Sequence, residues 1–166
     1  GGTLVVHAVS GRFPDGLLFD APLVGPTPPP RSVDKAFSPD QRHLQVYLAV
    51  PEYRPGARNV APAGDAVPTR WQAAEHLVRD ETTGLTERPI QVAPPSLRLI
   101  VEGESLEGYT TLPIARLERA STGEIGLDRS YVPPLIDVAA SEWLLSLARR
   151  LVERLSARSA ALSGSR

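Results

Sequence analysis

The amino-acid sequence predicts a mainly β protein, an antiparallel β-sandwich over residues 1–136 followed by one long C-terminal α-helix over residues 137–166. Two observations predict this division. All 17 prolines lie before residue 135, where short segments alternate between apolar and polar side chains. From Ser141 the chain runs to Gly164 without a proline or another glycine, and apolar residues recur there at helical spacing. Because proline interrupts helices and is tolerated in loop-rich β domains, the two parts should differ in secondary structure.

The beginning of the predicted sandwich is a strand, a turn and a return strand. Residues 3–9 alternate and are β-branched enough to form a strand. Residues 13–16, Phe-Pro-Asp-Gly, predict a turn whose glycine can adopt a positive φ, and we expect residues 17–20 to pair back. The proline-rich residues 21–31 then predict an extended connection that donates few ladder hydrogen bonds.

Residues 42–50 show the strongest strand pattern in the chain. One face carries His43, Gln45 and Tyr47, and the other carries Leu44, Val46 and Leu48. Such alternation predicts a half-buried strand, which Pro51 closes. Residues 54–68 are rich in proline, glycine and alanine and predict a loop. Residues 70–81 fit both a helix and a strand, and their context favours the strand.

The remaining strands lie at residues 89–92, 97–101, 109–119 and 124–127. Pro94-Pro95 should end one ladder before the next begins, and Thr122-Gly123 predicts a hairpin turn. Several short strands with such turns, and no helices between them, are typical of an antiparallel sandwich.

The C-terminal helix has a clear start signal and a broad apolar stripe. Ser141 is a good N-cap, and Glu142 follows it in the positively polarised first turn. The stripe follows the 3.5-residue repeat of a coiled coil, interrupted where Arg158 falls in register. Its seam residues are Leu144, Ala148, Leu151, Leu155 and Leu162.

An isolated helix of this length is only marginally stable in water, so the stripe needs a partner surface. One alternative is that the helix docks on its own β domain. We favour the other, in which copies of the chain pack together in a homo-oligomer. The predicted oligomer interface consists of Leu144, Leu147, Ala148, Leu151, Val152 and Leu155.

Composition and motifs predict neither an enzyme nor a cofactor. There is no cysteine, no Gly-x-Ser-x-Gly motif and no phosphate-binding glycine loop. His7, His43 and His76 lie in separate segments without metal-ligand spacing, so no metal site is predicted. The net charge of −1 and the absence of aromatic residues among the helix arginines Arg149, Arg150, Arg154 and Arg158 also argue against nucleic-acid binding. No segment is apolar enough to insert in a membrane, and the lack of cysteine fits the cytoplasm.

Several short segments follow one another in a fixed order along the chain. They are residues 13–16 (Phe-Pro-Asp-Gly), 46–51 (Val-Tyr-Leu-Ala-Val-Pro), 98–104 (Arg-Leu-Ile-Val-Glu-Gly-Glu), 108–109 with 112–116, and 131–134 (Tyr-Val-Pro-Pro) before Ala140-Ser141. This is the order seen in the TssK family of type VI secretion baseplate subunits, which the sequence resembles over nearly its whole length. Each segment is a weak signal alone, but their order and spacing together are specific.

The resemblance implies a cytoplasmic, trimeric, non-enzymatic baseplate adaptor. Its parts would be a β-sandwich shoulder similar to that of siphophage receptor-binding proteins, a helical neck and a C-terminal head. The shoulder would hold the TssF/TssG wedge, and the head would meet the membrane complex TssJ–TssL–TssM. Residues 1–136 would then be the shoulder and residues 137–166 the first neck helix.

The sequence departs from the family pattern in three places. A first hairpin with a Gly-Met-Phe-Leu-type segment is missing, Leu135 stands where many members carry cysteine, and the head is absent. The alternative from another class is a ligand- or carbohydrate-binding β-sandwich module. Such modules present rows of surface aromatic residues, and an aromatic content of 5% supplies few of them.

Overall fold

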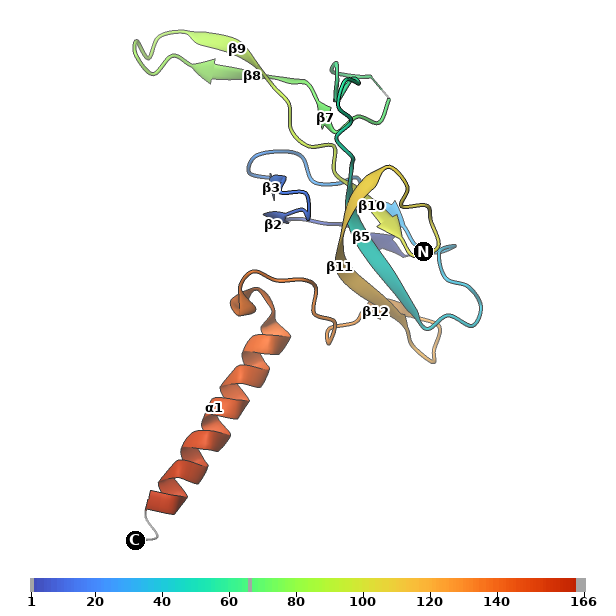
Figure 1. The fold of residues 1–166 in the computed structure, drawn as a ribbon, viewed down its shortest axis with the longest axis vertical. Helices are drawn as coiled ribbons and strands as arrows, with labels where there is room; N and C mark the ends of the chain where they lie inside the picture. The colour runs from blue at the N-terminus through green and yellow to red at the C-terminus, as the bar shows by residue number, and fades with distance from the viewer. Residues whose placement is uncertain (1, 66, 164–166) are drawn as a thin grey trace.

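The computed structural model describes residues 2–65 and 67–163, and its centre is a four-stranded antiparallel sheet (Figure 1). The strand order is β10 (Arg98–Val101), β5 (His43–Pro51), β11 (Tyr109–Arg119) and β12 (Ile125–Leu127). Leu48 of β5 lies opposite Leu99 on one side and Leu112 on the other. The strand predicted over residues 42–50 and the predicted β11–β12 hairpin are therefore both confirmed.

A second layer is made of short ribbons from the beginning of the chain. β1 (Thr3–Leu4) pairs with β4 (Arg31–Ser32), and β2 (Val9–Arg12) pairs with β3 (Leu18–Ala21). The prediction of one strand over residues 3–9 is wrong, because its two ends pair with different partner strands. The predicted return strand is confirmed as β3.

The hydrophobic core lies between the sheet and these ribbons, as expected of a sandwich. Phe13 is only 1% exposed and packs against Phe19, with ring centroids 4.8 Å apart. From the sheet side the core contains Leu44, Val46, Leu48, Val50, Leu99, Val101 and Leu117. All three apolar residues predicted for the buried face of β5 are completely buried.

The turn at residues 13–16 is fixed to the sheet by a buried arginine. Gly16 has a φ of +95°, as the turn prediction required. Arg70 is 4% exposed, and its guanidinium donates to Asp15 Oδ2 at 2.6 Å and to the Pro51 carbonyl at 2.9 Å. Burial of Asp15 acts to raise its pKa, but hydrogen bonds from the Leu17 N–H, Arg70 and Thr110 outweigh it and lower the pKa.

An arm projects from the sandwich (Figure 1). It begins where β6 (Val60–Ala61) pairs in parallel with β7 (Trp71–Gln72), and it extends as the hairpin of β8 (Ala74–Arg79) and β9 (Glu87–Val92). The strand interpretation of residues 70–81 is thus confirmed, and residues 54–65 and 67–68 form a loop apart from β6. The expectation that residues 89–92 belong to a sandwich layer is wrong, because β9 pairs only with β8 among the described strands.

The last part of the chain leaves the sheet and becomes helical. The 3₁₀ turn η1 (Val138–Ala140) precedes helix α1 (Glu142–Ser163). The Leu144 N–H donates to Ser141 Oγ at 3.3 Å, so the predicted N-cap is confirmed. The helix stands away from the strands (Figure 1). The helical part was predicted to extend to residue 166, and residues 164–166 lie outside the described ranges. Within those ranges, no helix combines the length and apolar character needed to span a bilayer.

Candidate interaction surfaces

The apolar stripe of α1 is the largest predicted site, and most of it is exposed among the residues that the structure describes. Leu144 is half-buried near the helix base, and Ala148 is exposed. The exposed fractions of Leu147, Leu151, Val152 and Leu155 are 44%, 57%, 62% and 60%. The alternative in which the helix docks on its own β domain is therefore not what the structure shows. The stripe remains available to another chain.

The helix geometry places the predicted residues on one face. With about 100° of rotation per residue, Leu144, Ala148, Leu151 and Leu155 form the centre of the stripe, and Leu147 and Val152 flank it. The structure thus brings all six predicted interface residues together. That copies of the same chain cover these residues stays a prediction.

A polar anchor fixes the segment that leads from the sheet to the helix. The Arg116 Nε donates to Asp128 Oδ2 at 2.7 Å, and its guanidinium lies 5.2 Å from the centre of the Tyr131 ring. Gln45 Nε2 is 3.1 Å from the Tyr131 hydroxyl. Because these contacts join β5, β11 and the segment after β12, the chain is tied to the sheet up to Tyr131. We call these four residues the exit anchor.

Acid should weaken the exit anchor. The Ser130 hydroxyl and Arg116 stabilise the ionised carboxylate and lower the pKa of Asp128 from 3.8 to about 2, although its burial opposes the shift. A folded-state pKa below the unfolded one stabilises the fold above about pH 4, and this contribution is lost as the pH falls towards about 2.

We expect Asp128→Asn to lower the free energy of unfolding at neutral pH and to flatten its decline between about pH 4 and about pH 2. Urea unfolding at a series of pH values measures this. Asp40→Asn, at an exposed loop residue, is the matched control. Equal acid sensitivity in wild type and Asp128→Asn would contradict the assigned role.

Close to the exit anchor, three side chains could supply ligand atoms to a cation. Single atoms of His43, Glu118 and Asp128 lie within 4.8 Å of one another, because β5, β11 and the residue after β12 are neighbours. The Asp128 carboxylate, however, already accepts hydrogen bonds from Arg116 and Ser130. His7 and His76 are not part of this group. We therefore assign Asp128 to the exit anchor and do not assign a metal centre to these three residues.

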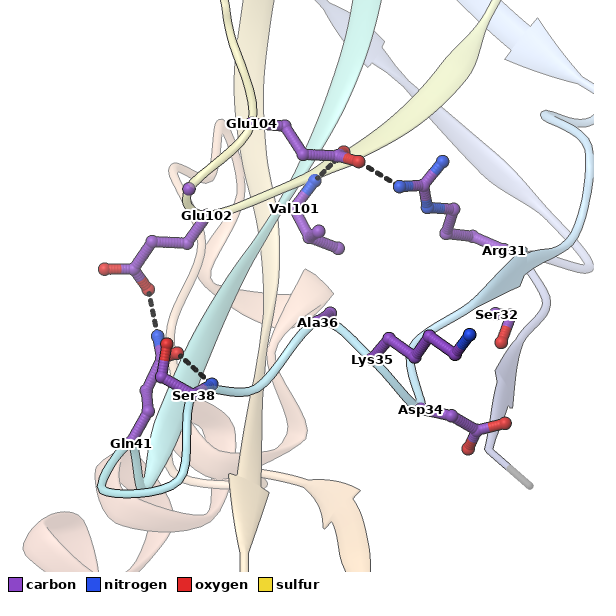
Figure 2. A pocket seen from close by; sticks show the side chains of 11 residues that line it. Arg31, Ser32, Asp34, Lys35, Ala36, Ser38, Gln41, Val101, Glu102 and Glu104 are labelled. Carbon is purple, nitrogen blue, oxygen red and sulfur yellow. Dashed lines mark hydrogen bonds and ion pairs between the residues drawn. The ribbon is translucent and has the colours of Figure 1, made fainter.

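Figure 2 shows a polar groove of about 980 Å³ between the loop after β4 and the turn after β10. Glu104 pairs with Arg31 and accepts from the Val101 N–H at 3.1 Å. On the other side, Glu102 accepts from Gln41 Nε2 at 3.4 Å and from the Gln45 N–H at 3.0 Å. Because these two carboxylates connect the turn after β10 with β4, β5 and the loop before β5, they stabilise the fold.

The arm offers an exposed apolar surface that the sequence did not single out. Leu77 and Ile90 point to opposite faces of the β8–β9 hairpin, and both are exposed. A two-stranded hairpin without a core is marginally stable in water. The alternation of residues 89–92 predicts a strand, but it does not indicate whether that strand belongs to the sandwich or to a separate hairpin.

Comparisons with known proteins agree with the fold. The model of the family described as Bacterial Type VI secretion, VC_A0110, EvfL, ImpJ, VasE matches residues 1–166. The type VI secretion system baseplate component TssK1 of Pseudomonas aeruginosa is 32% identical over 166 residues, which cover 98% of this chain and 36% of that protein. The chain thus spans little more than a third of that curated relative.

Solved structures extend the comparison to three dimensions. A chain of the type VI secretion system TssK–TssF–TssG baseplate subcomplex matches with a TM-score of 0.89 and 25% identity, over 99% of this chain and 54% of that one. A crystal structure of TssK matches with a TM-score of 0.80 and 26% identity, over 98% of this chain and 36% of that one. Because the family model covers every residue and the fold agrees, this chain belongs to the TssK family of bacterial type VI secretion.

Proposed function

We propose that the chain is the shoulder and first neck helix of a structural adaptor in the type VI secretion baseplate. In this proposal the protein is a non-enzymatic, cytoplasmic homotrimer. The β part (residues 1–136) holds the TssF/TssG wedge, and the helical part (residues 137–166) joins the protomers through α1. A C-terminal head, beyond the part of the family matched here, would link the trimer to the membrane complex TssJ–TssL–TssM.

One observation carries the proposal. The helix α1 is 22 residues long and presents an apolar face from Leu144 to Leu155, and the other described residues leave it exposed from Leu147 onwards. Exposed apolar stripes of this size on long helices are covered in stable proteins, most simply by copies of the same helix. The TssK relative in complex with TssF and TssG supports the choice of wedge partners.

The polar groove gives no support to the alternative ligand- or carbohydrate-binding module. Carbohydrate sites place aromatic faces against sugar rings, and the groove lining contains none. Its carboxylates Glu102 and Glu104 are engaged by Gln41, Gln45, Arg31 and the Val101 N–H. An adaptor therefore explains the exposed stripe of α1 and the lack of aromatic residues in the groove better than a ligand-binding module does.

Co-expression with TssF and TssG from the same bacterium tests the wedge contact. We expect a tagged TssG, together with TssF, to retain the chain through size-exclusion chromatography as one complex. The control is the chain with an unrelated tagged protein under the same conditions. A chain that is folded and assembled, yet elutes apart from TssF and TssG, would contradict the proposed shoulder function.

A further inference from the structure

The root of the arm, where the chain enters at Arg70 and leaves at Ser96, is held together by backbone hydrogen bonds. The Ser96 N–H donates to the Arg70 carbonyl at 2.9 Å, and the Gln72 N–H donates to the Pro94 carbonyl at 3.1 Å. β7 also pairs with β6, which lies in the loop after β5 and in neither layer of the sandwich. These bonds join the two segments of the root to each other and to a loop, so they do not by themselves fix the direction of the arm.

The Arg70 side chain connects this root to both layers. It is 4% exposed, and its Nη1 donates to the Pro51 carbonyl at the end of β5 at 2.9 Å. Its Nη2 donates at 2.6 Å to Asp15 Oδ2, in the turn between β2 and β3. The Thr110 hydroxyl of β11 donates to the same carboxylate oxygen at 3.1 Å. One guanidinium therefore joins the arm, the sheet and the ribbon layer.

Two apolar contacts also hold the root. The Tyr53 and Trp71 rings meet edge to face with centroids 6.2 Å apart. A Cβ added to Gly25 would lie 2.9 Å from Pro94 Cβ, so the loop after β3 approaches the root closely. Apolar contacts depend on the area that they bury and not on direction, whereas a guanidinium is a planar fork with fixed donor directions. The polar contacts of Arg70 are therefore the ones that select a single direction.

Turning the arm would pull this guanidinium away from its acceptors. Because Pro51 and Asp15 lie in different layers, a rotation about either acceptor breaks the bond to the other. Arginine stays charged at physiological pH, and a buried charge that loses its partner is strongly destabilising. The contacts of Arg70 thus oppose a swing of the arm in any direction.

We propose that Arg70 is a positioning residue that locks the β8–β9 arm in one direction relative to both layers of the sandwich. The arm is then a rigid projection, and its exposed residues Leu77 and Ile90 stand at fixed positions relative to the sheet. The contacts of the lock lie within one chain, so the lock needs neither the oligomer nor the wedge.

Pulsed electron paramagnetic resonance on the full chain tests the lock. The sequence has no cysteine, so spin labels can be placed at Leu77→Cys in the arm and Leu127→Cys in the sheet, where both side chains are exposed. Mixing with an excess of unlabelled chain restricts the measurement to distances within one chain. Leu77 lies at most about 23 Å along extended strands from Arg70, so a swing of about 20° would move it by about 8 Å.

The wild-type chain should give one narrow distance distribution. Arg70→Met keeps an unbranched side chain but removes both donors, and it should broaden the distribution by about 8 Å. Asp15→Asn keeps the shape of the acceptor without its charge and should broaden it less. Arg58→Met is the matched control, because Arg58 pairs with Asp65 at 2.7 Å on the exposed loop before the root. This control should keep the wild-type distribution.

A second pair of labels, at Leu18→Cys and Leu127→Cys, measures the sandwich itself and should stay narrow in every variant. A folded Arg70→Met chain whose arm distances remain as narrow as in wild type overturns the lock. So does a chain in which both label pairs broaden alike, because Arg70 would then only stabilise the sandwich. If Arg70→Met does not fold, Arg70→Lys and Asp15→Asn decide by the same two comparisons, since a single ammonium group lacks the fork that reaches both acceptors.

Discussion

Leu151→Asp should convert the assembled chain into monomers while the β part remains folded. Leu151 lies at the centre of the exposed stripe, and 57% of it is accessible in the single chain. Burying a leucine contributes about 2 kcal/mol, or about 6 kcal/mol for the three copies in a trimer. The protein concentration at which half of the chains are assembled scales with the square root of the trimer dissociation constant. This concentration should therefore rise at least about 100-fold. Three carboxylates in one layer add repulsion to this loss.

Sedimentation velocity over a range of concentrations measures the effect, and circular dichroism checks that α1 survives. Ala160→Asp is the matched control, since it adds the same charge to the opposite face of the helix. We expect this control to assemble like wild type. If Leu151→Asp and Ala160→Asp assembled equally well, the stripe would not be the oligomer interface.

Phe13→Ala should cause the largest loss of stability within a single protomer, about 3–5 kcal/mol. Phe13 directly follows β2 and is 1% exposed. Its ring contacts Phe19, with the ring centroids 4.8 Å apart. Its removal leaves a cavity where the ribbon layer meets the sheet. Urea unfolding followed by near-ultraviolet circular dichroism measures the change.

The measurement is best made in the Leu151→Asp background, so that association does not contribute to the unfolding free energy. Leu18→Ala provides the control, because Leu18 lies in the same ribbon but is 72% exposed. We expect the control to change the unfolding free energy by less than about 0.5 kcal/mol. A Phe13→Ala loss of the same size would contradict the placement of Phe13 between the layers.

The elements that local sequence determines could be predicted well. The alternation of residues 42–50 identified the buried face of β5, and Ser141 identified the start of α1. The turn at residues 13–16 followed from the position of Gly16. In each case the deciding interaction lies within a few residues of the chain, where periodicity, caps and turn preferences act.

Features that depend on distant partners could not be predicted. β1 pairs with β4 across the proline-rich connection, and this pairing divides the strand expected at residues 3–9. Nothing in the alternation of β8 and β9 says that they leave the sandwich. The exit anchor joins Gln45, Arg116, Asp128 and Tyr131, whose spacing in sequence has no local pattern. The interface residues of α1 were found by their periodicity, and their assignment to an oligomer stays a prediction.

The exit anchor also has a mechanical consequence. Contacts with the sheet hold the chain as far as Tyr131, and helical structure begins at Val138. The short joint between them contains Pro133-Pro134 and Ile136, which is 89% exposed. The 22-residue α1 is about 33 Å long, so a rotation of about 10° at this joint would move its far end by about 6 Å. The direction of this joint would therefore determine where the far end of α1 lies relative to the sheet.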